Sequence, residues 1–111
     1  MKLCNTPNCR PELHGLWDDF PGSKDDPVGA IRKAKALPPP DVDQAKNLDD
    51  AVWIGESFEE AQKSAYVDPI GIGDGPFQVD ADYRANGRKV SALRIALAGA
   101  RLANLLNDAF K

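Results

Sequence analysis

A histidine and an aspartate four residues apart are the side chains of this sequence best suited to chemistry. His14 is the only histidine among the 111 residues, and Asp18 follows it after Gly-Leu-Trp. On a helix, four residues turn through about 400°, so the two side chains share one face about one turn apart. Imidazole and carboxylate groups both bind zinc, and the spacing therefore indicates a pair of metal ligands. A surface histidine beside a surface aspartate would show the same spacing.

Two cysteines, Cys4 and Cys9, lie close together near the N-terminus. The Asn-Thr-Pro-Asn segment between them favours a turn that can bring two cysteines within disulfide reach. We favour a small disulfide-closed loop in an oxidising compartment. A zinc site built from Cys4, Cys9, His14 and one further ligand is a second interpretation, although zinc ribbons use a shorter cysteine spacing. Two free thiols are the third.

The composition is typical of one small soluble domain. The chain is 42% hydrophobic and 28% charged, which is enough for a modest core. Its net charge of -3 argues against a strong electrostatic grip on nucleic acid, so phosphate contacts would need a metal or another part of a larger protein. No apolar run is long enough to span a membrane, and the first five residues do not resemble a signal peptide. The chain is expected to be cytosolic or part of a longer precursor.

Turn and capping signals predict two short helices in the first third of the chain. The first is expected over residues 11–20, between a proline and a Pro-Gly pair. The second begins at Asp26-Pro27, where the aspartate is an N-cap and the proline takes the first helical position. It ends near Leu37, because three consecutive prolines follow.

Two long helices are predicted in the rest of the chain. One begins near Asn47 or Asp49, and its apolar residues repeat at spacings of three and four, which predicts a single buried stripe. That stripe consists of Ala51, Ile54, Phe58, Ala61 and Ala65. The other runs from Asp80 to about Phe110. The glycine-rich segment 68–76 between them is interpreted as a turn and not a phosphate loop, because no Lys-Ser/Thr pair follows it.

The apolar pattern of the last helix predicts that this all-α fold is incomplete. Its apolar positions cover more than half of its circumference, so it must be covered on more than one side. One long helix and two short ones do not readily supply that cover. Either the protein forms oligomers or it is the C-terminal part of a larger helical domain, and we favour the second explanation.

Three segments of this sequence resemble a known enzyme family in the same order along the chain. Residues 13–18 (Leu-His-Gly-Leu-Trp-Asp) look like the Asn-Leu-His-x-x-Trp-Asp motif of the zinc-dependent S-one/P-one nucleases, which belong with the zinc-dependent phospholipases C. Residues 53–57 (Trp-Ile-Gly-Glu-Ser) resemble that family's Trp-x-x-Glu-Ser helix. Residues 97–107 are similar to its Ala-Gly-x-Arg-Leu-Ala-x-x-Leu-Asn ending. The likeness spans nearly the whole chain.

The resemblance implies a helical bundle-like domain of phospholipase C/P-one nuclease type, of which this chain is the C-terminal part. Residues 1–22 would carry metal ligands and residues 23–111 would supply packing helices. The parent enzyme would be periplasmic or secreted, hold up to three zinc ions, and cut single-stranded DNA and RNA with 3′-nucleotidase activity. His14 and Asp18 would ligate one of these zinc ions, and the other ligands would lie in the missing N-terminal half of the domain.

The sequence also departs from that family pattern. Glu12 stands where the family usually has asparagine, which adds a charge and removes the amide donors beside the metal ligand. With a single histidine, the isolated chain is expected to be inactive as a nuclease. Two alternatives remain at this stage: a non-catalytic helical interaction module, and a small zinc-binding domain that uses Cys4, Cys9 and His14.

Overall fold

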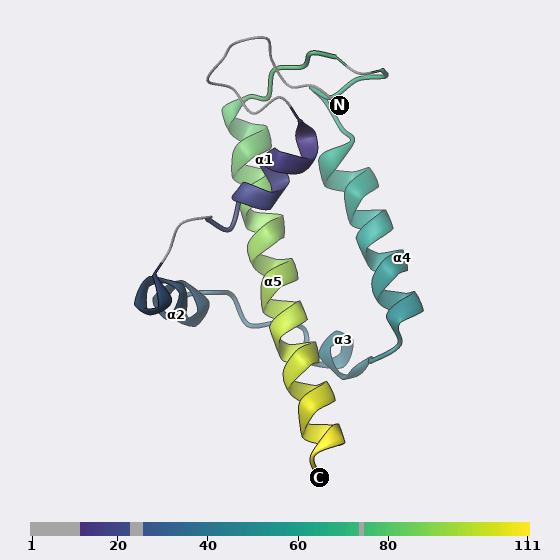
Figure 1. The fold of residues 1–111 in the computed structure, drawn as a ribbon. Helices are drawn as coiled ribbons and strands as arrows, with labels where there is room; N and C mark the ends of the chain where they lie inside the picture. Colours follow the sequence, from purple (N-terminus) through teal and green to yellow (C-terminus); the bar gives the residue numbers. More distant parts are fainter. Residues whose placement is uncertain (1–11, 23–25, 74) are drawn as a thin grey trace.

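The chain folds into helices joined by extended connections in the computed structural model, which describes residues 12–22, 26–73 and 75–111 (Figure 1). The α-helices are α1 (Leu13–Asp19), α2 (Pro27–Lys35), α3 (Val42–Lys46), α4 (Asp50–Glu60) and α5 (Ala81–Ala109). A π-helical turn, η1 (Ala61–Ala65), continues α4 without a break. No strand occurs in these ranges, so the predicted all-α fold class is confirmed.

Aspartate side chains fix where most of these helices begin. Asp26, Asp49 and Asp80 each accept a hydrogen bond from a backbone N–H in the first turn that follows, as N-cap residues do. These three starts agree with the sequence prediction. The short helix α3 was not predicted, and it begins in the same way, with Asp41 accepting from the backbone N–H of Gln44 at 2.9 Å.

Helix α5 is the central element, and α1, α3 and α4 lie beside it (Figure 1). Helices α4 and α5 run in opposite directions, α1 crosses the N-terminal half of α5, and α3 lies near its C-terminal half (Figure 1). The hydrophobic core lies at the α1 end and consists of Leu13, Leu16, Ile70 and Tyr83, with Trp17, Phe20, Val67, Phe77 and Val79 packed around them. The end that carries the predicted metal ligands is therefore the best packed part of the described chain.

The predicted buried stripe on α4 is wrong. Ile54 and Phe58 are 70% and 63% exposed, because no described element covers their side of the helix. Helix α4 instead turns Trp53 and Glu56 toward α5, where Arg101 contacts both of them. The apolar spacing identified the helix, but an ion pair decides which face it turns inward.

Candidate metal and substrate site

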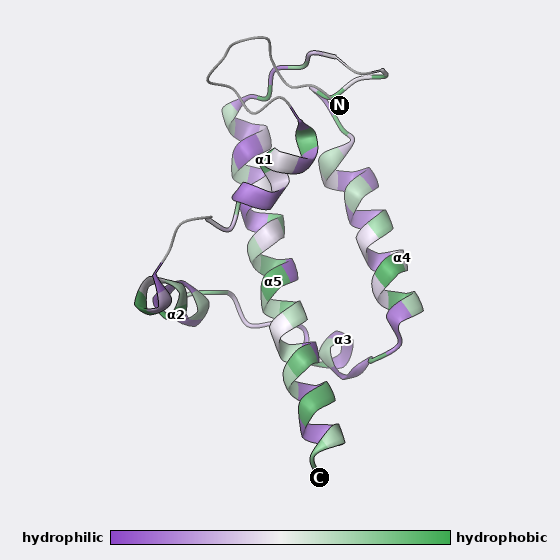
Figure 2. Cartoon of the chain, viewed as in Figure 1, coloured by the Kyte–Doolittle hydropathy of each residue, from purple (hydrophilic) through white to green (hydrophobic). Residues whose placement is uncertain are grey.

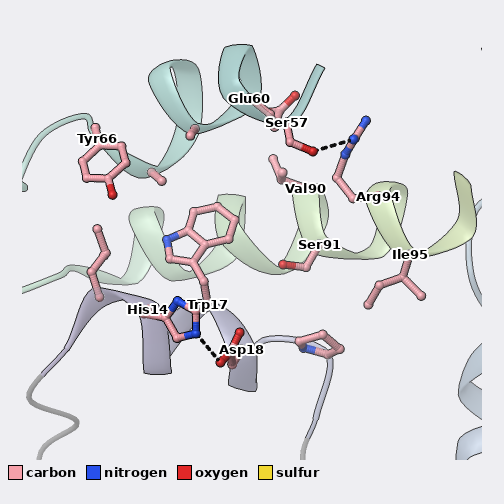
Figure 3. Close-up of a pocket in the computed structure, with 14 residues that line it drawn as sticks. His14, Trp17, Asp18, Ser57, Glu60, Tyr66, Val90, Ser91, Arg94 and Ile95 are labelled. Carbon is pink, nitrogen blue, oxygen red and sulfur yellow. Dashed lines mark hydrogen bonds and ion pairs between the residues drawn. The ribbon is translucent and has the colours of Figure 1, made fainter. Parts of the chain in front are cut away.

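His14 and Asp18 lie side by side on α1. The His14 Nε2 atom is 3.0 Å from the Asp18 Oδ2 atom, and the two side chains point toward each other (Figure 3). Both remain open to solvent, with exposed fractions of 83% for His14 and 65% for Asp18. The structure therefore brings together the two groups that the sequence spacing put on one face, whereas their role as metal ligands stays a prediction.

The pair lies at the rim of a cavity of about 530 Å³. Helix α5 forms the floor of this cavity, α1 forms one wall, and α4 with η1 forms the other (Figure 3). Its polar lining beyond the pair comes from Ser57, Glu60, Tyr66, Ser91 and Arg94. The cavity is large enough for a small ligand, since ligand pockets usually measure about 300–1,000 Å³.

A chain of hydrogen bonds holds the wall that carries His14 and Asp18. The Trp17 Nε1 atom donates to the Tyr83 hydroxyl at 3.0 Å, and that hydroxyl donates to the carbonyl oxygen of Ala65 at 2.7 Å. One phenol group thus joins α1, α5 and η1. Tyr83 is buried, and burial raises the pKa of its hydroxyl, which keeps the hydroxyl neutral and able to donate. Trp17 therefore packs α1 against α5.

A glycine on α5 lets α1 approach closely. A Cβ atom built on Gly87 would lie 2.3 Å from the Phe20 ring, which is closer than two carbon atoms can come. Phe20 also packs edge-on against Trp17, with their ring centroids 5.0 Å apart. Because Gly87 has no side chain, the end of α1 can lie this close to α5.

An ion pair fixes the opposite wall. The two guanidinium nitrogens of Arg101 donate to the two carboxylate oxygens of Glu56 at 2.7 and 2.9 Å. The Arg101 Nε atom donates to the carbonyl oxygen of Gln44 at 3.1 Å, so this side chain ties α3 to α4. The hydrogen bonds from Arg101 lower the pKa of Glu56 from 4.5 to about 2, although desolvation opposes that shift. Glu56 is therefore ionised at any pH near neutrality.

Arg94 adds a second link between α4 and α5 at the cavity itself. Its Nη2 atom donates to the Ser57 hydroxyl at 3.1 Å, and its Nη1 atom lies 3.4 Å from Glu56. Nearby, the Ser64 hydroxyl donates to the Glu60 carboxylate at 2.7 Å. The polar side chains of this wall are therefore mostly hydrogen-bonded to one another.

His14 and Asp18 fit zinc in donor type and in spacing. Two ligand atoms at about 2.0 Å from a tetrahedral ion lie about 3.3 Å apart, which is close to the 3.0 Å found here. A structural or catalytic zinc site needs at least three protein ligands, and the described residues contain no cluster of three or more His, Cys, Asp or Glu side chains that could hold a metal. The pair alone therefore supplies fewer ligands than a zinc site requires. The predicted ligands or disulfide partners Cys4 and Cys9 lie outside the described residues.

The groups that position the site were not singled out from the sequence as positioning residues. Trp53, Glu56 and Arg101 all belong to segments that carried the family resemblance, yet their contact depends on two helices that are far apart along the chain. The approach of Phe20 to Gly87 likewise joins α1 to α5. A glycine in a strongly helical segment was the available signal, because it weakens a helix unless packing requires it.

No family model, curated protein or solved structure matches this chain. Among the helices of the described ranges, none combines the length and the apolar character that crossing a bilayer requires.

Proposed function

We propose that this chain is the C-terminal portion of a zinc-dependent nuclease of the S-one/P-one type, in which His14 and Asp18 bind one zinc ion of a cluster. The parent enzyme hydrolyses phosphodiester bonds in single-stranded DNA and RNA, acts on nucleotide 3′ phosphates, and works in a periplasmic or secreted setting. The single observation that carries the proposal is the contact of His14 with Asp18 at the rim of a cavity that three helices line.

Contact between the motif segments gives further support. The residues that resemble the family lie in three separate parts of the chain, and the fold joins two of them through the Glu56–Arg101 pair. The third segment, on α1, contacts α5 at Tyr83, which lies outside the other two segments. Contact between segments that are far apart in the sequence is expected if they act as one unit in the parent domain.

The roles of this chain's own groups follow from their geometry. The 3.0 Å contact to Asp18 places the proton of a neutral His14 on Nε2, since a carboxylate can only accept. A cation held through Nε2 would require the neutral tautomer of His14 that carries its proton on Nδ1. Asp18 then balances part of the cation's charge, and the packing of Trp17 holds both ligands at one rim of the cavity.

Zinc bound at such a site supplies hydroxide near neutral pH and stabilises the negative charge that develops on a phosphodiester. The cavity has the size for a nucleotide, and the exposure of His14 and Asp18 leaves room for further ligands beside them. Those ligands are proposed to come from the missing N-terminal half of the domain.

Zinc binding by the 111-residue chain tests the ligand role. We expect weak binding of one zinc ion per chain, measured by calorimetry and by metal analysis after dialysis. His14→Ala and Asp18→Asn should each weaken binding at least about 10-fold, since even groups behind a ligand contribute that much. Asp108→Asn is the matched control, because Asp108 also forms an exposed ion pair, with Lys111, at the other end of α5.

Two outcomes would contradict the proposal. If zinc binding survives in His14→Ala and Asp18→Asn, these residues are not ligands. If it is lost in Cys9→Ser but kept in Asp18→Asn, the small Cys4, Cys9 and His14 site is the correct interpretation. The nuclease assignment itself is tested by the sequence encoded upstream of Met1, where we expect an open reading frame rich in histidine and aspartate.

A further inference from the structure

Two arginines of α5 share one carboxylate of α4. Both oxygens of Glu56 accept hydrogen bonds from Arg101, at 2.7 and 2.9 Å, so these two charges balance each other. Arg94 lies further from the same carboxylate, with its Nη1 atom 3.4 Å from the Glu56 Oε1 atom. Arg94 is also the more accessible arginine, since its side chain is 29% exposed and that of Arg101 is 5% exposed. The group of three therefore holds one uncompensated positive charge, and it lies on Arg94.

That charge lies at the cavity beside His14. Arg94 lines this cavity and extends from α5 to α4 at one end of it (Figure 3). It also lines a smaller hollow of about 220 Å³ and so lies between the two spaces. A guanidinium has five N–H donors in a fixed fork, and the bonds from Arg94 to Ser57 and Glu56 use two of them. In the described part of the chain, three donors of Arg94 remain for a ligand.

Two serine hydroxyls line the same cavity close to this guanidinium. The Ser57 hydroxyl accepts a hydrogen bond from Arg94 at 3.1 Å, and its own proton can therefore be donated to a second acceptor. Ser91 precedes Arg94 by three residues, so the two side chains are neighbours on one face of α5. Arg94, Ser57 and Ser91 together offer a cation and hydroxyl donors from both long helices.

The half of α5 that carries Arg94 is basic, although the chain as a whole is acidic. From Ala81 to Ile95 the helix has four cationic side chains and one carboxylate, whereas the net charge of the chain is -3. Figure 2 shows this half of α5 as the more hydrophilic one and its C-terminal turns as mostly hydrophobic. A local excess of positive charge attracts anions to the surface beside it. An anion is therefore the class of ligand that Arg94 favours.

Two carboxylates line the same cavity and oppose an anion. Glu60 accepts a hydrogen bond from the Ser64 hydroxyl at 2.7 Å, and Asp18 pairs with His14 at the rim. These two negative charges exceed the one positive charge of Arg94. A divalent cation held by His14 and Asp18 would offset both carboxylates, so an anion is expected to bind weakly without metal and more tightly with it.

We propose that Arg94, together with the hydroxyls of Ser57 and Ser91, binds a phosphate group of a nucleotide in this cavity. The identity of the ligand rests on the proposed function, and the inference deepens that function by assigning a phosphate-binding group in addition to the metal. A guanidinium can donate two parallel N–H bonds to two phosphate oxygens, and serine hydroxyls can donate to the others. The cavity of about 530 Å³ has room for the rest of the nucleotide.

NMR titration of the full chain in a metal chelator tests the proposal. The probe is a deoxynucleoside 3′-monophosphate, and inorganic phosphate and the nucleoside without phosphate are the comparisons. We expect the nucleotide and inorganic phosphate to shift the Arg94 Nε–H signal and the backbone amides of Ser57 and Ser91. The nucleoside should bind at least about 10-fold more weakly than the nucleotide, because it lacks the charged group that Arg94 recognises.

Three variants separate a specific contact from a general effect of charge. Arg94→Gln should weaken nucleotide binding at least about 10-fold, because it removes both the charge and the donor fork. Arg88→Gln is the matched control, since Arg88 is an exposed arginine of the same helix that does not line the cavity, and its effect should stay below about 2-fold in 0.15 M salt. Ser91→Ala leaves the Glu56 contacts intact and should weaken binding about 3-fold to 10-fold.

Circular dichroism shows which variants keep their helices. Weaker binding by a helical Arg94→Gln protein, beside unchanged binding by Arg88→Gln, supports the proposal, and Ser91→Ala decides the matter if Arg94→Gln does not fold. Absent shifts in the wild-type chain, or equal effects of Arg94→Gln and Arg88→Gln, would overturn it. Zinc should tighten nucleotide binding by the wild type and not by His14→Ala. If zinc tightens neither, the metal role of His14 fails while the phosphate site stands.

Discussion

Removing the charge of Glu56 should destabilise the fold strongly while leaving its shape nearly unchanged. Glu56→Gln keeps the size of the side chain but replaces one of the two oxygens that Arg101 contacts at 2.7 and 2.9 Å. The Arg101 side chain is 5% exposed and the Glu56 side chain 19%, so the variant leaves a nearly buried cation without its counter-ion. Breaking a fully buried pair costs about 3–5 kcal/mol, and we expect about 2–3 kcal/mol here because Glu56 is partly hydrated.

The pH dependence gives this prediction a specific signature. The folded pKa of Glu56 is about 2 and the unfolded value is 4.5, so the folded state favours the ionised form. The stabilisation is therefore complete above pH 4.5 and is lost as the pH falls through 2. The difference in the free energy of unfolding between wild type and Glu56→Gln should be constant from pH 7 to 5 and shrink steadily below 4.5.

Urea unfolding, followed by circular dichroism at a fixed protein concentration, measures both quantities. Glu59→Gln is the matched control, because Glu59 is an exposed glutamate on the same helix, and its stability should change by less than about 0.5 kcal/mol. A loss in Glu56→Gln no larger than in this control would refute the assignment of the ion pair as the tie between α4 and α5. So would a difference that does not narrow below pH 4.5.

Three further predictions concern the α1 end and the isolated chain. Tyr83→Phe removes the acceptor of Trp17 and should cost about 1–3 kcal/mol in urea unfolding, with a shift in tryptophan emission that Tyr66→Phe does not cause. Gly87→Ala should cost about 1–3 kcal/mol through its clash with Phe20, and the same substitution should cost much less in a Phe20→Ala background. Equal costs of Gly87→Ala in the two backgrounds would contradict the contact. The pure chain with zinc should not digest single-stranded DNA, since it has one histidine, and measurable zinc-dependent cleavage would disprove this.

The elements of this fold were predictable because their signals are local. Asp26 and Asp80 cap helices with their own side chains, and the apolar residues of α5 from Val90 to Ala109 recur mostly at spacings of three and four. The contact between His14 and Asp18 was predictable for the same reason, since both lie within a single turn of one helix. Helix α3 was missed because it is a single short turn between prolines and Asn47, with little apolar pattern of its own.

The orientation of the long helices was not predictable, because it depends on groups that meet across the fold. Apolar spacing put Ile54 and Phe58 on the buried side of α4, yet Arg101 draws the opposite face of that helix inward through Glu56. A charged pair can override apolar spacing only where nothing covers the apolar side. The exposure of Ile54 and Phe58 on α4, and of Leu102, Leu105 and Leu106 on α5, thus has one physical cause: the chain has more apolar helix surface than its described elements bury.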